Sequence, residues 1–317
     1  MPRANDLNDL SGKDWIKFTR TWFVCDSPRY WRNRETELHP ARFPEEMVAE
    51  FLRFFTKGGG AVLDPFAGSG ATLVACAEQE RVGVGVELSA RYARTAKRRV
   101  RKASPPQFVI PGDARRLRRR DFWSEEREAL EAAGIPFSRG WPQFDFAITS
   151  PPYWRMLRTS RGGVFSKHKQ RAAKGLDTVY SDDPGDLGNV ERYEDFVEGL
   201  GRVFDGVGRL VKEGKYLVVV AQNLRDPEGR VRMLAWDLAR RIEGVRAGQD
   251  LRVLSLAPDK KGRRPSSCPT GRPQWVFQGE RIWCQNTKPL GIWGYPRIFV
   301  PNYHHHYCLI FRKHEAG

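Results

Sequence analysis

Residues 62–77, with the sequence VLDPFAGSGATLVACA, constrain the fold of this chain more than any other stretch. An apolar run ends in Asp64, a turn that contains Gly68 and Gly70 follows, and an apolar helical pattern begins directly after the turn. Glycine lets the backbone turn tightly and approach a ligand closely. The first N–H groups of the following helix have no partner within that helix. The stretch matches neither a P-loop nor a dinucleotide fingerprint. We predict a strand, a ligand-binding loop and a helix here.

Short apolar runs alternate with helical patterns along most of the chain. We expect strands over residues 61–64, 81–87, 107–111, 144–149, 215–221, 251–257 and 306–312, and helices over 44–57, 89–102 and 193–213. This alternation is typical of an α/β fold, in which helices cover both faces of a mostly parallel sheet. Such sheets bind ligands at the carboxyl ends of their strands.

The next two apolar runs also end in acidic residues. Glu87 lies 23 residues beyond Asp64, and Asp113 follows the run after that. A carboxylate at the position of Glu87 can accept hydrogen bonds from ribose hydroxyls, and Asp113 can accept one from an exocyclic adenine amine. The three acids describe a pocket for a nucleoside with a free 2′-OH and a cationic attachment. Helix capping is the alternative for any single one of them.

A second motif, TSPPYW at residues 149–154, follows another apolar run. The two prolines stiffen the turn and remove two N–H donors. The Ser150 hydroxyl and the Pro151 carbonyl can hold the hydrogens of an exocyclic base amine and direct its lone pair at an electrophilic methyl group. Tyr153 and Trp154 offer ring faces for a base flipped out of a duplex. A rigid loop is the alternative for the tetrapeptide alone.

Basic residues are in large excess and are clustered. Lys and Arg number 54 against 38 Asp and Glu, so the formal net charge is +16. Residues 91–120 hold 12 Lys or Arg and one acid, residues 155–175 hold 7 and no acid, and residues 259–273 form a third basic stretch. Any one run is compatible with a solvated face. Three runs favour a surface that follows a phosphate backbone.

Several other classes of protein are disfavoured. The cysteines form no C-x-x-C pair, so we expect no zinc ribbon. We interpret the run His304–His306 as the start of a strand and expect no metal site. Cys268-Pro269 does not support a covalent cysteine mechanism. The chain contains neither an apolar run of about 20 residues nor the apolar core of a signal peptide. We therefore expect a cytoplasmic protein with no membrane partner.

Six stretches together carry a resemblance to a known family: HPARFP (39–44), DPFAGSG (64–70), GVELSARY (85–92), PGDA (111–114), TSPPYW (149–154) and PNYHHHYCLIFRK (301–313). They resemble the amino-group DNA methyltransferases that use S-adenosylmethionine. The resemblance implies a Rossmann-like α/β fold with seven strands, of which the last is antiparallel. It also implies a catalytic domain over 44–313, preceded by an N-terminal arm over 1–43.

The resemblance also implies the roles of individual residues. Cofactor contacts would come from Phe43, Asp64, Phe66, Ala67, Gly68, Gly70, Glu87, Asp113 and Ala114. Asp64 and the loop 66–70 would lie at the methionine part, Glu87 at the ribose and Asp113 at the adenine. The catalytic turn would comprise Ser150, Pro151, Pro152 and Tyr153. S-adenosylhomocysteine would be the product, and no metal is required.

The nature of the target follows from a correlation within the family. Serine at the first position of the catalytic turn usually accompanies methylation at N4 of cytosine, and Asp or Asn accompanies N6 of adenine. Ser150 thus favours site-specific methylation of cytosine N4 in double-stranded DNA, with base flipping, in a prokaryotic nucleoid. Adenine N6, RNA, a protein side-chain amide and a catalytically silent DNA-binding subunit are alternatives. A homodimer and a companion restriction endonuclease remain open.

The segment that recognises the target is not evident. Only four residues follow the last expected strand, so recognition must come from the inserted loops 155–190 and 258–303, from the arm, or from a second subunit. The second loop carries three tryptophans and neighbouring arginines, which suit DNA contact or a small core: Trp275, Trp283, Trp293, Arg272, Arg281 and Arg297.

A near-copy of the catalytic motif, DSPRYWR, occupies residues 26–32. Arg29 replaces the second proline of the motif, and only eight residues separate Tyr30 from His39. This spacing is too short for the strands that should intervene, so we assign the catalytic turn to the later copy.

Overall fold

The structure is a computed structural model that describes residues 5–26, 43–154, 183, 185–226, 228–244, 275–288, 290–292 and 296–314. Its centre is an eight-stranded sheet with the order β1-β11-β12-β8-β7-β2-β3-β4. The strands are β1 (Trp22–Val24), β2 (Ala61–Asp64), β3 (Val82–Glu87), β4 (Phe108–Pro111), β7 (Phe144–Thr149), β8 (Val211–Ala221), β11 (Trp275–Cys284) and β12 (His305–Lys313). Strands β4, β3, β2, β7 and β8 are parallel, and β12 is antiparallel to both β8 and β11. The predicted α/β sheet with an antiparallel last strand is confirmed.

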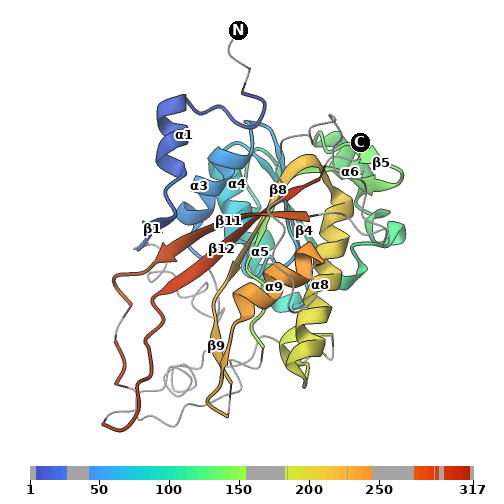
Figure 1. The fold of residues 1–317 in the computed structure, drawn as a ribbon. Coiled ribbons are helices and arrows are strands. Elements are labelled where there is room, and N and C mark those ends of the chain that lie inside the picture. The colour runs from blue at the N-terminus through green and yellow to red at the C-terminus, as the bar shows by residue number, and fades with distance from the viewer. Residues whose placement is uncertain are drawn as a thin grey trace, which may run out of the picture.

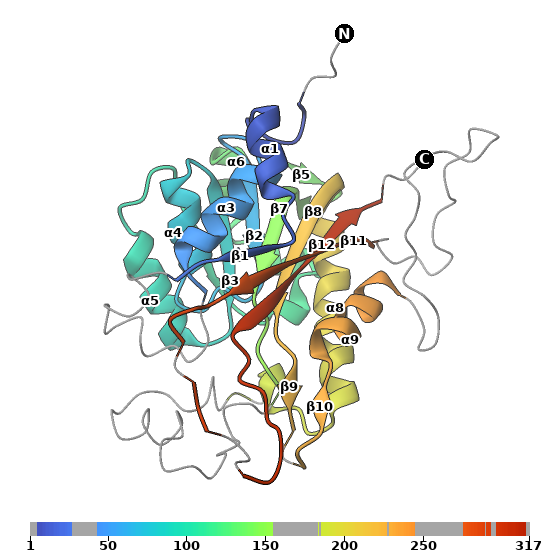
Figure 2. The same ribbon diagram turned by 60° about the vertical axis from the view of Figure 1, so that its left-hand side comes forward.

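Helices cover both faces of this sheet, as Figures 1 and 2 show. The helices are α1 (Gly12–Phe18), α3 (Glu45–Phe55), α4 (Ala71–Glu78), α5 (Ala90–Val100), α6 (Arg127–Ala132), α8 (Tyr193–Leu210) and α9 (Leu234–Glu243). Short 3-10 turns η2 (Ala114–Arg116), η3 (Arg120–Trp123) and η4 (Leu187–Asn189) join them. Two small hairpins pair β5 (Phe137–Ser138) with β6 (Trp141–Pro142) and β9 (Leu224–Arg225) with β10 (Val231–Arg232). None of the described helices is long and apolar enough to cross a membrane.

Alternating side chains of the strands form two separate cores. On β7, Phe146 and Ile148 pack with the residues of α3 and α4, whereas Ala147 packs with those of α8 and α9. Val218 and Val219 of β8 divide between the same two faces. Successive side chains of a strand point to opposite faces of the sheet, so apolar runs are what a sheet covered on both faces requires.

Strand β11 lies where a loop was expected. Residues 275–284 form a ten-residue strand inside the segment 258–303, and the strand expected over 251–257 lies outside the described residues. Trp275 and Trp283 are each 1% exposed, and Arg281 is 6% exposed. Of the two alternatives for these three side chains, burial in a core is confirmed and DNA contact is excluded by their burial. A β-bulge and the polar run that begins at Gln278 interrupt the apolar pattern, which hid the strand.

The N-terminal arm is part of the fold and does not stand apart from it. Strand β1 pairs in parallel with residues 282–284 of β11 and adds an eighth strand to the expected seven. Phe18 of α1 stacks on Phe54 of α3 with ring centroids 3.9 Å apart, and the Asn8 side chain donates a hydrogen bond to the carbonyl of Phe54. The guanidinium of Arg281 lies 4.0 Å from the ring centroid of Phe18. These contacts bury the arm against α3 and β11.

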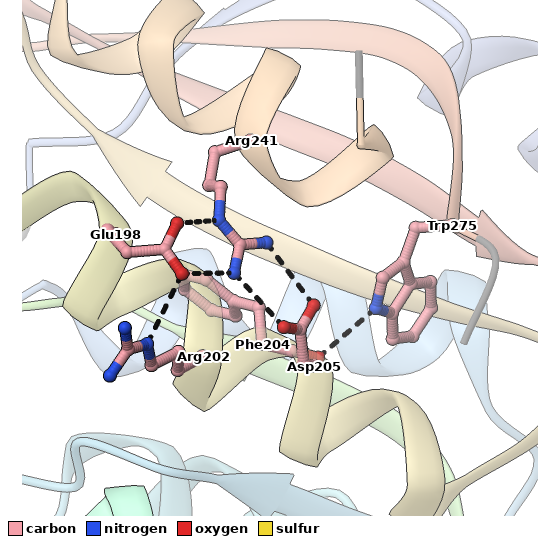
Figure 3. A network of polar contacts seen from close by, with 6 residues as sticks. All are labelled: Glu198, Arg202, Phe204, Asp205, Arg241 and Trp275. Carbon is pink, nitrogen blue, oxygen red and sulfur yellow. Dashed lines mark hydrogen bonds and ion pairs between the residues drawn. The ribbon is translucent and has the colours of Figure 1, made fainter. Parts of the chain in front are cut away.

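A partly buried polar network joins α8, α9 and β11 (Figure 3). The Arg241 guanidinium of α9 donates to Glu198 at 2.6 Å and to Asp205 at 3.0 Å, both on α8. The Trp275 indole donates to the carbonyl of Phe204 at 3.3 Å. The network fixes the position of α9 and of the first residue of β11 relative to α8.

Candidate functional site

A cleft of about 870 Å³, counting the part open to solvent, lies at the carboxyl ends of the parallel strands. Its walls come from the residues that follow β2, β3, β4 and β7, and from the segment that precedes α8. The lining residues are Phe43, Pro65, Phe66, Ala67, Gly68, Ser69, Ala71, Val86, Glu87, Leu88, Ser89, Tyr92, Gly112, Asp113, Ala114, Ser150, Pro151, Pro152, Gly185, Asp186 and Leu187. The cleft is where an open parallel sheet is expected to bind its ligand.

The glycine loop forms a tight turn, in which the Gly70 amide donates to the carbonyl of Ala67, and it packs against α5. Gly68 and Gly70 have φ angles of 52° and 84°, in the left-handed region that glycine adopts without strain. A Cβ on Gly70 would lie 2.9 Å from the Cβ of Ala96 in α5, so no larger residue fits there. Gly70 therefore shapes the loop without lining the cleft, whereas Phe66, Ala67 and Gly68 line it.

Asp64 joins the glycine loop to the end of β7 from within the protein. Its carboxylate accepts hydrogen bonds from the Thr149 hydroxyl at 2.6 Å, the Thr72 hydroxyl at 2.5 Å and the Phe66 amide at 3.0 Å. The residue is 1% exposed and does not line the cleft. Burial raises the pKa of this carboxyl, and the three hydrogen bonds oppose that rise. The structure thus places Asp64 behind the predicted site, as an anchor of two of its walls.

Glu87 presents its carboxylate inside the cleft. It accepts hydrogen bonds from the amides of Gly68 and Ser89, both at 2.8 Å. Burial raises the pKa of this carboxyl to about 7, the two amide hydrogen bonds lower it, and the charges of Asp64 and Asp186 raise it further. A carboxylate oxygen has more than one acceptor site, so Glu87 can bind ribose hydroxyls while it holds the glycine loop.

Asp113 and Ala114 line the far end of the cleft. The Asp113 side chain caps η2 by accepting from the amide of Arg115 at 2.8 Å, and it forms an ion pair with the Arg115 guanidinium at 2.6 Å. The capping role considered for this acid is therefore observed. It leaves the residue in the cleft, beside Gly185.

The turn Ser150–Tyr153, which was predicted to be catalytic, enters the cleft with only part of its residues. Ser150, Pro151 and Pro152 line it, whereas Tyr153 is 5% exposed and lies in the main core. Trp154 is 7% exposed, and its indole donates to the carbonyl of Val190 at 2.9 Å. Neither aromatic ring offers an open face in this structure, so the expected stacking surface for a base is absent from the described part of the turn.

Several lining residues were missed from the sequence. Gly185, Asp186 and Leu187 follow the segment 155–182 and cover the end of the cleft near Asp113. Asp186 caps η4 by accepting from the Gly188 amide at 2.8 Å. No motif in the sequence indicates this segment. Its only local signal is Asp186 two residues before Gly188, a spacing that suits a capped turn.

Some predictions fall outside the described residues. These are residues 27–32 of the near-copy motif, residues 39–42 of the cofactor-flanking motif, the segments 155–182 and 258–274, Arg272 and Trp293. Phe43, the last aromatic of the flanking motif, does line the cleft. His305 and His306 begin β12, as the strand interpretation of the histidine run predicted. His306 stacks on Trp283 with ring centroids 4.7 Å apart. Within the part of the chain that is described, no three His, Cys, Asp or Glu side chains form a group suited to a metal ion.

Comparisons with known proteins concern mainly the first third of the chain. Residues 4–98 match the family model of the DNA methylases. Type II methyltransferase M.SmaI of Serratia marcescens is 44% identical over 72 residues, which are 22% of this chain and 25% of that protein. Type II methyltransferase M.BglI of Bacillus subtilis is 30% identical over 97 residues, which are 30% of this chain and 26% of that protein. The chain thus spans about a quarter of the length of these curated relatives.

Among solved structures, a putative rRNA-methylase from Clostridium thermocellum is 9% identical, with a TM-score of 0.40 over 86% of this chain and 98% of that one. The sequence likeness to DNA methylases thus lies within residues 4–98, which hold the glycine loop and Glu87. Over this part the chain is similar to the N6/N4 amino-methyltransferase family of DNA methylases.

Proposed function

We propose that this chain transfers a methyl group from S-adenosylmethionine to the exocyclic N4 amine of a cytosine flipped out of double-stranded DNA. The observation that carries the proposal is that Ser150 and Pro151 line the same cleft as Glu87 and Asp113. The residues suited to orient an amine and those suited to hold a nucleoside therefore face one space. The choice of cytosine over adenine rests on Ser150 alone.

The donor groups of the cleft fit the proposed cofactor. Glu87 has a partly buried carboxylate at the end of β3, where ribose hydroxyls can donate to it. Asp113 and Ala114 follow the neighbouring strand β4 and line the same cleft, where they could receive the adenine that is attached to that ribose. Gly68 and Ser69 bring the backbone of the glycine loop to the cleft. Phe43 adds an apolar wall.

S-adenosylmethionine supplies an electrophilic methyl group when it is bound. The Ser150 hydroxyl and the Pro151 carbonyl accept the two hydrogens of the base amine and turn its lone pair toward the methyl donor. Because an exocyclic amine is a poor nucleophile, positioning and electrostatics supply the rate enhancement. Asp64 holds this turn in place through Thr149, the residue before Ser150.

The test is to incubate the purified protein with S-adenosylmethionine and mixed-sequence duplex DNA, to digest the DNA to nucleosides, and to identify methylated bases by mass spectrometry. N4-methylcytosine is the expected product. N6-methyladenine would keep the cleft assignment and overturn the base assignment. If the protein binds the cofactor and leaves the DNA unmethylated, then the proposed substrate is wrong, and RNA or a protein amide is tested next. The homodimer and the companion endonuclease stay predictions.

A further inference from the structure

Helix α5 carries a face of unpaired positive charge next to the cleft. Two cations of the helix and two that directly follow it are exposed and form no ion pair with any described residue: Arg94, Lys97, Arg101 and Lys102. We call this set the α5 ridge. The opposite face of the helix is buried through Tyr92, Ala93, Ala96 and Val100. Residues three or four positions apart lie on the same side of a helix. Arg94, Lys97 and Arg101 therefore form a continuous row.

The basic run at 91–120 divides into two halves with different surroundings. In the second half, Arg115 pairs with Asp113, Arg119 pairs with Asp121, and Arg120 lies 4.5 Å from the ring centroid of Trp141. Those arginines have partners within the fold. The residues from 88 to 112 contain no acid, so the ridge has no acidic neighbour along its own stretch of chain.

Folding alone does not explain the charges of the ridge. Like charges three or four residues apart destabilise a helix by roughly 0.2–0.5 kcal/mol per pair. The ridge holds such pairs between Arg94 and Lys97 and between Lys97 and Arg101. The helix dipole favours cations in the last turn, where Lys97 lies, but disfavours them near the beginning, where Arg91 and Arg94 lie. Burial of the apolar face offsets this repulsion, and an external polyanion would remove it.

The position and length of the ridge suit a nucleic-acid strand. The first turn of α5 contributes Ser89 and Tyr92 to the cleft, so the ridge begins at the rim of the cleft and leads away from it. From Arg94 to Arg101 the helix rises about 10 Å at roughly 1.5 Å per residue. One strand of duplex DNA carries about three phosphates over that length, since phosphates follow each other every 3.4 Å or so along the axis.

We propose that the α5 ridge binds the phosphate backbone of duplex DNA next to the cleft, with Arg94, Lys97 and Arg101 each neutralising one phosphate. The proposal rests on the proposed function, because it needs a DNA substrate in the adjacent cleft. The contacts are to the backbone, so they position the duplex and carry no sequence information. The target sequence must be read by other parts of the protein.

The test is a salt series of DNA binding with a triple variant, Arg94→Ala, Lys97→Ala and Arg101→Ala. The matched control is the triple variant Lys13→Ala, Arg53→Ala and Lys57→Ala, which removes three exposed cations from α1 and α3 and from the turn after α3. Binding of a labelled duplex is measured by fluorescence anisotropy with S-adenosylhomocysteine present. Affinity for S-adenosylhomocysteine is measured separately by calorimetry.

In the ridge variant, the plot of log affinity against log salt should become shallower by about 2 to 3, since each lost phosphate contact accounts for roughly 0.9. At moderate salt the Kd for DNA should rise by at least about ten-fold. Affinity for S-adenosylhomocysteine should stay within about two-fold, because none of the three side chains lines the cleft. The control variant should keep most of the wild-type slope.

Two results would overturn the proposal. One is an equal loss of slope in both variants, which would make the ridge an ordinary part of the overall positive charge. The other is a selective loss of binding to duplex RNA of the same sequence with DNA binding retained. If the wild-type protein methylates DNA and the ridge variant keeps its full slope, then only this inference fails. If the wild-type protein neither binds nor methylates DNA, then the proposed function fails with it.

Discussion

At the scale of single residues, the carboxylate of Glu87 is the group whose protonation state matters most for ligand binding in the cleft. It lies at the end of β3, holds the amides of Gly68 and Ser89, and has a pKa raised to about 7 by burial. A ribose hydroxyl donates a hydrogen bond more strongly to an ionised acceptor. The protonation state of this one group should therefore determine how tightly a nucleoside binds at neutral pH.

We predict that affinity for S-adenosylhomocysteine increases as pH rises from about 6 to 8. The pKa of Glu87 in the folded protein lies above the ordinary value for a glutamic acid, so the ionised form becomes dominant only as pH passes through 7. Glu87→Gln should bind at least about ten-fold more weakly at pH 8 and show little dependence on pH. Calorimetric titrations at several pH values measure both. An equally steep pH dependence in the variant would assign the titration to another group.

Ser150→Ala should separate chemistry from cofactor binding. The hydroxyl is proposed to orient the base amine, so its loss should lower kcat by roughly 10²-fold, as the loss of one positioned polar group commonly does. The affinity for S-adenosylhomocysteine should stay within about two-fold. Single-turnover methylation and calorimetry provide the two values. Equal losses in both would place Ser150 at the cofactor and contradict the proposed role.

The residues of the cleft were predictable to different degrees. Phe66, Gly68, Glu87 and Asp113 follow strand ends, and motifs at strand ends are visible in the sequence because the apolar run stops there. Asp64 shares that position, yet its side chain turns inward to Thr149 and Thr72. Which way a side chain at a strand end points depends on tertiary hydrogen bonds, and the sequence does not display them.

At the scale of elements, Asp64 at the end of β2 is hydrogen-bonded to Thr149 at the end of β7, and both stability and activity should depend on this contact. Asp64→Ala would leave the hydroxyls of Thr149 and Thr72 without their buried acceptor. We expect the free energy of unfolding to fall by about 2 to 3 kcal/mol. Cofactor affinity and turnover should fall together, because the glycine loop and the catalytic turn both lose their anchor. Urea denaturation and calorimetry test this, and a loss of affinity at unchanged stability would instead indicate direct contact with the cofactor.

The network between α8 and α9 allows a matched comparison. Arg241→Ala should lower the free energy of unfolding by about 2 to 4 kcal/mol, because it removes the Arg241 cation from beside Asp205, whose side chain is 10% exposed. Arg202→Ala removes the exposed partner of the same Glu198 and should cost less than about 1 kcal/mol. Chemical denaturation of the two variants gives the comparison. Similar losses in both would mean that burial adds nothing to the strength of this network.

The elements themselves were predicted well where the sheet is parallel and covered on both faces. The apolar runs of β2, β3, β4 and β7 have the expected bounds to within one residue. Strand β11 was missed because Glu280 and Arg281 interrupt its pattern, and because only its pairing with β1 and β12 makes room for them. Arg281 is buried between the rings of Phe18 and Phe23, a tertiary environment that its own neighbours in sequence do not suggest.

At the scale of the whole molecule, the N-terminal arm completes the sheet. Removing residues 1–26 would expose the edge of β11 and the apolar surface of α3 around Phe51 and Phe54. We expect this deletion to lower the midpoint of thermal unfolding and to increase aggregation, because an open apolar edge pairs readily with other chains. Thermal scans and light scattering measure both effects. A deletion variant that remains monomeric and equally stable would show that β1 does not contribute to the stability of the sheet.

The pairing of β1 with β11 also determines when β1 can join the sheet during synthesis. Trp22 can pair with Ile282, its partner in the sheet, only after Ile282 has left the ribosome. At roughly 5 to 20 residues per second, the intervening chain takes on the order of 13 to 50 s to make. Through that interval the strand β1 has no edge to join, while β2, β3, β4 and β7 are already available to one another. Of the described strands, β1 is made first and yet is among the last to be placed, because its apolar residues have no partner strand until β11 has been made.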